Sequence, residues 1–481
     1  MIGVLLGTLV GVLPGLGPAA TIALLLPVTF TMSPETALIM IAGIYYGAQY
    51  GGSTTSILVN IPGEASSVVT CLDGYQMARR GRAGPALGIS AFGSFIGGTL
   101  SVVGLMLLGP VLARFALKFG PPEYFALMLL GIVILTFLSK GSMVKSFISA
   151  VIGLFVGTIG IDTLYGAQRF TYGSLTLMDG VGLVPVAMGL FGISEVLINI
   201  EQREVRDIFK SKIKGLLPTR QDWRESTGPV LRGSIVGFFL GILPGGGAIM
   251  ASFTSYAMEK RISRHPESFG KGAIAGVAGP ETANNAATGG AMIPLLSLGI
   301  PSNVIMALLI GAMMIHGIKP SCFLINEHPR IFWGVITSMY VGNILLLVLN
   351  LPLIGLWVRL LKVPYGILFP LILLFCLIGV YTVSNNSYEV LIMLIFGAVG
   401  YVMRKAGFEP APLLFAMVIG PIMETALRQS LLHSRGQFNI FFNRPISAVL
   451  IVAAILLLLA PLFPRVGRKR ETIVKEAPDD T

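Results

Sequence analysis

One stretch of this largely apolar chain concentrates polar groups and helix breakers, residues 281–303, which read ETANNAATGGAMIPLLSLGIPSN. The polar and helix-breaking residues in this stretch that are candidates for binding a ligand or an ion are Glu281, Asn284, Asn285, Thr288, Gly289, Gly290, Pro301, Ser302 and Asn303. A carboxylate near membrane depth is costly and is a functional hypothesis by default. Glu281, with Asn284 beside it, is therefore our candidate for holding a coupling ion. The alternatives are that Glu281 takes up a proton or that it only accepts hydrogen bonds from neighbouring N–H groups.

The composition of the chain requires a membrane around this stretch. Of 481 residues, 54% are hydrophobic and only 12% are charged, whereas soluble domains are about 25% charged. Apolar runs that approach or exceed the length of a transmembrane helix occur at 85–113, 123–139, 143–160, 180–200, 330–358, 365–382, 388–403 and 445–462. We expect an all-α polytopic membrane protein.

The charge and the metal-binding residue types exclude several other functions. The net charge of +11 lies in short connectors, where positive charges set topology, and so does not indicate nucleic acid. Three cysteines are scattered, and four histidines fall near connectors, which gives no metal-ligand pattern. We therefore expect no metal site and no cofactor.

An internal repeat divides the chain. GVLPGLG at 11–17 matches GILPGGG at 241–247, and YGGSTTSILVNIPGEASS at 50–67 matches TGGAMIPLLSLGIPSN at 288–303. The predicted organisation is a first repeat, a basic cytoplasmic linker, a second repeat, an extra C-terminal transmembrane helix and a cytoplasmic tail, at 1–200, 201–228, 229–428, 445–462 and 463–481.

The connectors indicate that the two repeats have opposite orientations. The segment 27–37 has no Lys or Arg, but its counterpart 256–271 has four; 73–84 has three arginines, but 316–330 has only Lys319 and Arg330. A sign change of this kind is what inverted-topology repeats require. In our model each repeat begins with a re-entrant hairpin at GxLPGxG and then crosses five times. The alternative is that these hairpins cross the membrane fully.

Paired broken helices at matching places in two halves are a pointer to a transporter's binding site. Helix N-termini present free N–H donors to an anion, and glycines let a ligand approach the backbone. The further candidates for substrate binding are therefore Gly15, Gly17, Gly51, Gly52, Ser53, Thr54, Thr55, Asn60, Pro62, Gly63, Gly245, Gly246 and Gly247. The competing interpretation is that the glycines serve helix packing and the hydroxyls bond to their own helix.

The quoted motifs, with GVLPGLGPAATIALLLP and YYGAQYGGSTTSILVNIPGEASSVVTCLDGYQMARRGRAGPAL, closely resemble the large membrane subunit of the bacterial tripartite tricarboxylate transporters. The likeness runs from residue 3 to about 460. Family members carry further residues before the position equivalent to Gly3, which implies a first repeat shortened at its N-terminus. The resemblance implies a multi-pass protein of the bacterial inner membrane. It also implies two partners, a small membrane subunit and a periplasmic solute-binding protein.

The expected function is secondary active import of a small, citrate-like di- or tricarboxylate by symport with Na⁺ or H⁺. The alternative is a passive anion channel, which would use the same breaks without cation coupling. An intramembrane enzyme ranks last, because the chain has neither HExxH nor GxSxG and no histidine in the middle of an apolar run.

Overall fold

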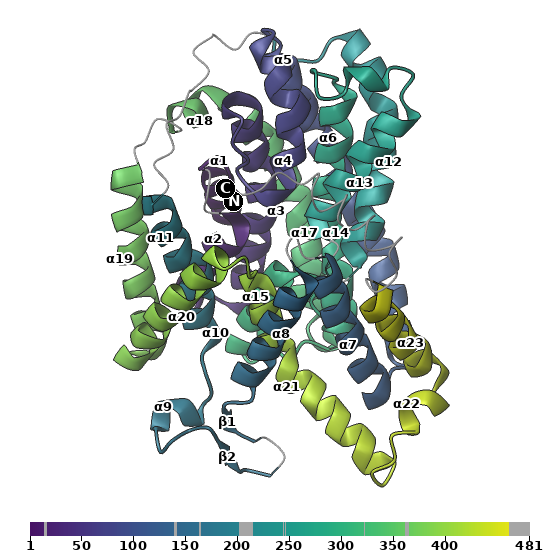
Figure 1. Cartoon of the computed structure of the whole chain (residues 1–481). Helices are drawn as coiled ribbons and strands as arrows, with labels where there is room; N and C mark the ends of the chain where they lie inside the picture. Colours follow the sequence, from purple (N-terminus) through teal and green to yellow (C-terminus); the bar gives the residue numbers. More distant parts are fainter. Residues whose placement is uncertain are drawn as a thin grey trace.

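The computed structural model describes residues 1–13, 17–138, 142–162, 165–201, 215–243, 245, 247–321, 323–360 and 365–460, and these are mostly helical (Figure 1). Among these described residues, five helices are long and apolar enough to cross a membrane by length and composition, at Ala83–Ala116, Leu183–Glu201, Pro329–Asn350, Ser387–Lys405 and Pro410–His433. The prediction of an all-α polytopic membrane protein is confirmed at this level. The strands of the described residues form one short antiparallel pair, β1 (Gly160–Ile161) and β2 (Gln168–Arg169).

The helices of the first half are α1 (Ile2–Val12), α2 (Gly17–Thr29), α3 (Pro34–Val59), α4 (Val68–Thr70), α5 (Gln76–Arg79), α6 (Ala83–Ala116), α7 (Pro121–Leu138), α8 (Met143–Gly157), α9 (Leu175–Met178), α10 (Leu183–Ala187) and α11 (Ser194–Glu201). A 3₁₀ turn, η1 (Ala65–Ser67), precedes α4, and π-helical turns η2 (Cys71–Tyr75) and η3 (Met188–Ile193) join α4 to α5 and α10 to α11.

The helices of the second half are α12 (Arg220–Ile242), α13 (Gly247–Ile262), α14 (Ala275–Leu298), α15 (Val304–Ile315), α16 (Leu324–Glu327), α17 (Pro329–Asn350), α18 (Ile354–Leu360), α19 (Tyr365–Ser384), α20 (Ser387–Lys405), α21 (Pro410–His433), α22 (Ile440–Asn443) and α23 (Pro445–Leu459). A 3₁₀ turn, η4 (Pro266–Ser268), lies between α13 and α14. The predicted C-terminal helix 445–462 thus corresponds to α23.

Two predicted boundaries differ from the observed ones. The predicted start of the second repeat, at 229, falls inside α12, because Thr219 and Asp222 form a capping box that starts this helix at Arg220. The charged first turns of α12 had suggested a linker. The apolar run 330–358 is two helices, and α17 ends at Asn350, because Pro352 has no N–H to donate and its ring clashes with the preceding turn of a helix.

Glycines spaced four residues apart let α1 and α12 lie directly on long helices of their own halves. A Cβ on Gly3, Gly7 or Gly11 would lie 2.2–2.4 Å from the carbonyl oxygens of Met40, Ile44 and Ala48 on α3. On α12 the equivalent glycines are Gly233, Gly237 and Gly241, where a Cβ would lie 2.2–2.5 Å from the carbonyl oxygens of Gly279, Ala283 and Ala287 on α14. In both pairs, higher residue numbers on one helix contact higher residue numbers on the other, so the two helices run parallel. Close contact of this kind through small residues is common within membranes.

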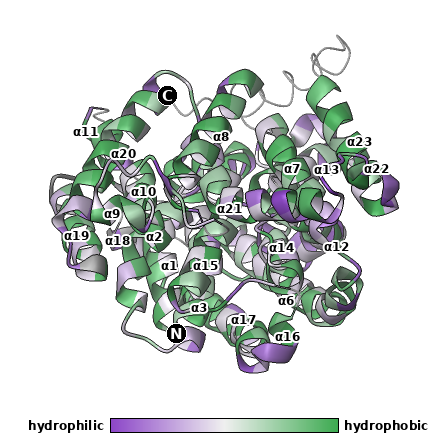
Figure 2. Cartoon of the chain, turned by 90° about the horizontal axis from the view of Figure 1, so that it is seen from below, coloured by the Kyte–Doolittle hydropathy of each residue, from purple (hydrophilic) through white to green (hydrophobic). Residues whose placement is uncertain are grey.

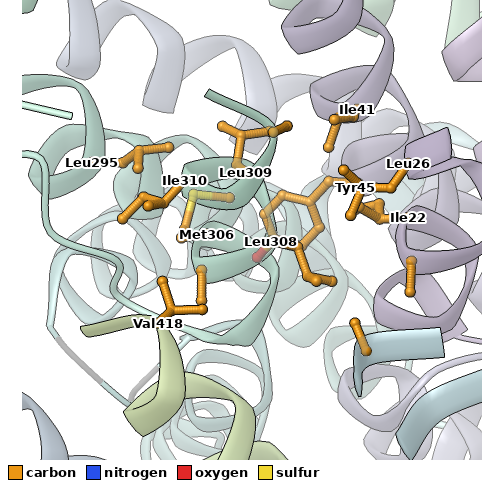
Figure 3. Packing of buried hydrophobic residues seen from close by; sticks show 14 of the residues in the cluster. Ile22, Leu26, Ile41, Tyr45, Leu295, Met306, Leu308, Leu309, Ile310 and Val418 are labelled. Atoms are coloured by element: carbon orange, nitrogen blue, oxygen red, sulfur yellow. The ribbon is translucent and has the colours of Figure 1, made fainter. Parts of the chain in front are cut away.

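The two halves share one apolar core. Figure 3 shows Tyr45 of α3 between Ile22 and Leu26 of α2 on one side and Leu308 of α15 on the other. Outside this core, long apolar side chains cover the outer helices, as the green ribbons of α8, α20 and α23 show in Figure 2. The chain is therefore apolar both inside and around its periphery, which is the pattern of a protein embedded in lipid.

The glycine ladder on α12 gives a test of this packing. We expect Gly237→Ala to lower the free energy of unfolding by about 1–3 kcal/mol, because the added methyl group would lie 2.2 Å from the Ala283 carbonyl oxygen. The control is Gly355→Ala on α18, where a Cβ meets nothing within 4 Å. Thermal unfolding of the detergent-solubilised variants measures the difference. Equal unfolding temperatures for the two variants would contradict the packing described for α12 and α14.

Candidate functional site

The helix breaks of the two halves have the same local build. Asn60 is the C-cap of α3 and Gly299 is the C-cap of α14, and both residues have left-handed backbone, with φ of 61° and 70°. A proline lies two residues after each of them, and a polar side chain then caps the next helical turn. Glu64 accepts from the N–H of Ser66, and Asn303 accepts from the N–H of Met306.

Glu281 lies between the halves rather than within one of them. Its side chain is fully buried on α14, and its carboxylate accepts hydrogen bonds from Ser53 Oγ of α3 and Thr70 Oγ1 of α4. Ser90 of α6 hydrogen-bonds to it as well. No Lys, Arg or His of the described residues forms an ion pair with Glu281. Hydroxyl groups are thus the partners that stabilise its charge or its proton.

A second carboxylate, Glu64, is buried in the break after α3, where it contacts Asn284 of α14. Its Oε1 accepts from Asn284 Nδ2 at 3.1 Å, and its Oε2 accepts from the Ser66 amide at 2.9 Å. The Gln49 amide nitrogen, in the orientation that satisfies its neighbours, lies 2.8 Å from Glu64 Oε1. Asn284 therefore joins the first half's break to the helix that carries Glu281.

The predicted hydroxyl and amide residues divide into two groups. Ser53 reaches Glu281, and Asn285 donates to Ser94 Oγ of α6 at 2.7 Å. Three hydroxyls bond to backbone instead. Thr55 donates to the Val12 carbonyl at 3.0 Å, and Thr288 donates to the Asn285 carbonyl of its own helix. Ser302 Oγ likewise donates to a backbone carbonyl, that of Ala291 at 3.3 Å. Thr54 lines a small cavity beside Glu281.

Neighbouring groups occupy the sides of the glycine pairs where we expected a ligand to approach. A Cβ on Gly51 would lie 2.4 Å from the Thr8 carbonyl oxygen, and one on Gly52 2.8 Å from Glu64 Cγ. On α14, a Cβ on Gly289 would lie 2.2 Å from Ser101 Oγ, and one on Gly290 2.2 Å from the Phe238 carbonyl oxygen. These four glycines have a packing role here, and their contact with substrate stays a prediction.

Each GxLPGxG loop contacts the break of its own half. The Gly245 N–H donates to the Ser302 carbonyl at 2.7 Å, and Gly63 is packed against the Gly11 carbonyl oxygen. Gly17 and Gly247 begin α2 and α13. Gly15 and Gly246 lie outside the described residues. At the breaks themselves, Asn60 is exposed, Pro62 is half-buried and Pro301 is buried.

Three residues of this site, Gln49, Thr70 and Ser90, were missed from the sequence, and Glu64 was ranked too low although a signal existed for it. In the alignment of NIPGEASS with GIPSN, Glu64 occupies the place of Asn303, and both act as helix caps. From the sequence Asn303 was a candidate, and Glu64 was only a weaker candidate because it lies next to a break. Gln49, Thr70 and Ser90 carried no such signal, because single polar residues in membrane helices are common and most bond to their own backbone.

Comparison with known proteins assigns the chain to a family. Residues 1–415 match the sequence profile of the Tripartite tricarboxylate transporter TctA family. The chain belongs to this family.

Two relatives of this TctA-family chain come from Agrobacterium vitis. One, described as an uncharacterised 52.8 kDa protein in the TAR-I ttuC' 3' region, is 50% identical over 475 residues, covering 99% of this chain and 95% of the relative. The other, described as an uncharacterised protein in the TAR-II ttuC' 3' region, is 48% identical over 240 residues, covering 50% of this chain and 99% of the relative. No solved structure matches the chain.

The cap at the second break gives a test of the site's local structure. We expect Asn303→Ala to lower the free energy of unfolding by about 1 kcal/mol, because the Met306 N–H loses its acceptor at 2.9 Å. Asn303→Asp retains an acceptor and should restore most of the loss. Thermal unfolding in detergent measures both variants, and a full loss in Asn303→Asp would count against the capping role.

Proposed function

We propose that this chain is the transport subunit of a secondary active importer. It takes up a small, citrate-like di- or tricarboxylate by symport with Na⁺ or H⁺. The observation that carries the proposal is Glu281, a fully buried carboxylate with hydroxyl partners from the other half of the chain. Such a carboxylate attracts a cation or a proton, and a site whose ligands come from two halves changes when the halves move.

The substrate carboxylates would bind near the second break. Helix α15 begins there, and Asn303 is its N-cap. The side-chain nitrogen of Asn303, Nδ2, lies 3.4 Å from Tyr45 Oη of α3. Backbone and hydroxyl donors without Lys or Arg suit an anion that must also be released. Glu64 already places a carboxylate at the equivalent point of the first break. Glu64 therefore shows that backbone N–H groups at such a break can donate hydrogen bonds to a carboxylate.

The proposed movement uses inverted repeats with re-entrant hairpins, α1–α2 and α12–α13. Three observations support this architecture: the order hairpin, long helix and break recurs, the parallel glycine ladders recur, and the left-handed residues at the breaks match. The second helices of the two hairpins, α2 and α13, have 13 and 16 residues, whereas a transmembrane helix needs about 20. A hairpin that enters and leaves on one side fits these short lengths.

The family also supports proposals for place and partners. We propose that the subunit lies in the bacterial inner membrane, with the linker and C-terminal tail in the cytoplasm. Its proposed partners are a small membrane subunit and a periplasmic solute-binding protein that delivers the carboxylate. An enzyme is not proposed, because the family is one of transporters.

Uptake into proteoliposomes tests the function. The complete transporter with its solute-binding protein should accumulate radiolabelled citrate or another carboxylate above equilibrium when a Na⁺ or H⁺ gradient is imposed. Glu281→Gln should reduce accumulation at least about tenfold while membrane insertion is retained, because the amide cannot carry the negative charge. Equilibration without accumulation in the wild type would favour a passive anion channel.

Thiol labelling tests the inverted arrangement. In a background without the native cysteines, Phe30→Cys and Ile262→Cys place thiols at the ends of the two hairpins, where both side chains are exposed. An impermeant maleimide should label residue 30 from the periplasm and residue 262 only after the membrane is permeabilised. If the reagent reaches both cysteines from the same side, the repeats are not inverted.

A further inference from the structure

A small polar cavity lies beside Glu281, on the side facing α6 and α17. It is lined by Tyr50, Ser53, Thr54, Leu87, Ser90, Ala91 and Asn350. It has room for about one water molecule, which is too little for a tricarboxylate. Five of its seven lining residues carry an oxygen in the side chain, and Ser53 and Ser90 also hydrogen-bond to Glu281.

Two of these oxygens are buried without a hydrogen-bond partner in the described part of the chain. They are the Tyr50 hydroxyl and Asn350 Oδ1, on side chains that are only 3% and 5% exposed. Leaving such groups unsatisfied costs free energy, so each calls for an explanation. The Asn350 amide nitrogen donates to the Leu346 carbonyl at 2.9 Å. Its Oδ1 is therefore the group left for a ligand.

The cavity presents mainly acceptors. Asn350 Oδ1 can only accept, and the Ser53 proton is directed to Glu281, so the lone pairs of Ser53 remain for a cation. Hydroxyl and amide oxygens are ligands for hard cations. The negative charge of Glu281 lies directly behind the serine hydroxyls and would neutralise a single positive charge.

We propose that this cavity binds one Na⁺ ion, with Tyr50, Ser53, Ser90 and Asn350 as oxygen ligands and Glu281 as the compensating charge. The proposal deepens the proposed function, on which it rests, by assigning the coupling ion and its place. It also joins ligands of α3, α6 and α17, so ion binding would hold helices of both halves together.

Ion-specific stabilisation of the purified full-length chain tests the site. NaCl should raise the unfolding temperature more than KCl or choline chloride at equal ionic strength, because an ion that binds the folded state stabilises it. Asn350→Leu and Tyr50→Phe should each raise the Na⁺ concentration for half of this shift by at least about tenfold. Tyr50→Phe removes one oxygen only and keeps the ring in place.

Tyr46→Phe is the matched control. Tyr46 lies one turn before Tyr50 on α3, and its hydroxyl donates to the Ser338 carbonyl, which is outside the cavity. This variant should keep the Na⁺ response of the wild type even if its unfolding temperature falls. Equal shifts with NaCl and KCl in the wild type would overturn the proposal and indicate a bound water. An unchanged Na⁺ response in Asn350→Leu would overturn it too.

The failure of this site and the failure of the proposed function are distinguishable. Carboxylate accumulation driven by a proton gradient in the absence of Na⁺ would overturn the Na⁺ site and leave symport intact. A Na⁺-specific shift that is lost in Asn350→Leu, together with no accumulation of carboxylate, would support the site and remove the symporter.

Discussion

The buried carboxylate of Glu281 needs hydrogen-bond donors inside a protein that lies in hydrocarbon. This requirement determines which helices pack around it at the centre of the molecule. The groups that satisfy it, Ser53, Thr70 and Ser90, all belong to the first half, whereas Glu281 belongs to the second. A buried carboxylate that lost these hydroxyls would carry a large penalty. The two halves are therefore held at one relative position as long as the charge remains there. A cation or a proton that neutralises it would relax that requirement.

The glycine ladders make this arrangement possible. Parallel contact of α1 with α3 and of α12 with α14 brings helix backbones close enough for a Cβ to clash at each glycine. Such closeness places α14 where Glu281 and Asn284 reach α3 and the first break. The same small residues therefore serve packing directly and the polar site indirectly. This dual role is why glycine patterns in membrane helices are hard to assign to either purpose from sequence.

Much of the fold was readable from the sequence, and less of the site was. The apolar runs correspond to observed helices, and the breaks at Asn60–Pro62 and Gly299–Pro301 lie where the glycine and proline pattern indicated. Of the candidates, Ser53 contacts Glu281, and Asn284 of the same helix contacts Glu64, whereas their roles in binding stay predictions. Helix α12 begins at Arg220, before the predicted start of the second repeat at 229, and the charged residues in its first turns are why the sequence indicated a linker there. Contacts from residues such as Thr70, Ser90 and Asn350 depend on which helices are neighbours, and periodicity does not contain that information.

The pairing of the halves through Glu64, Asn284 and Glu281 is the central claim, and a double-mutant cycle tests it most directly. The measurement is the initial rate of citrate uptake by the complete transporter, for the wild type, Glu64→Gln, Glu281→Gln and the double variant. If the two carboxylates act as one unit, the double variant should lose little more than the worse single variant. Losses that multiply, as for distant and independent sites, would contradict a shared site between the halves.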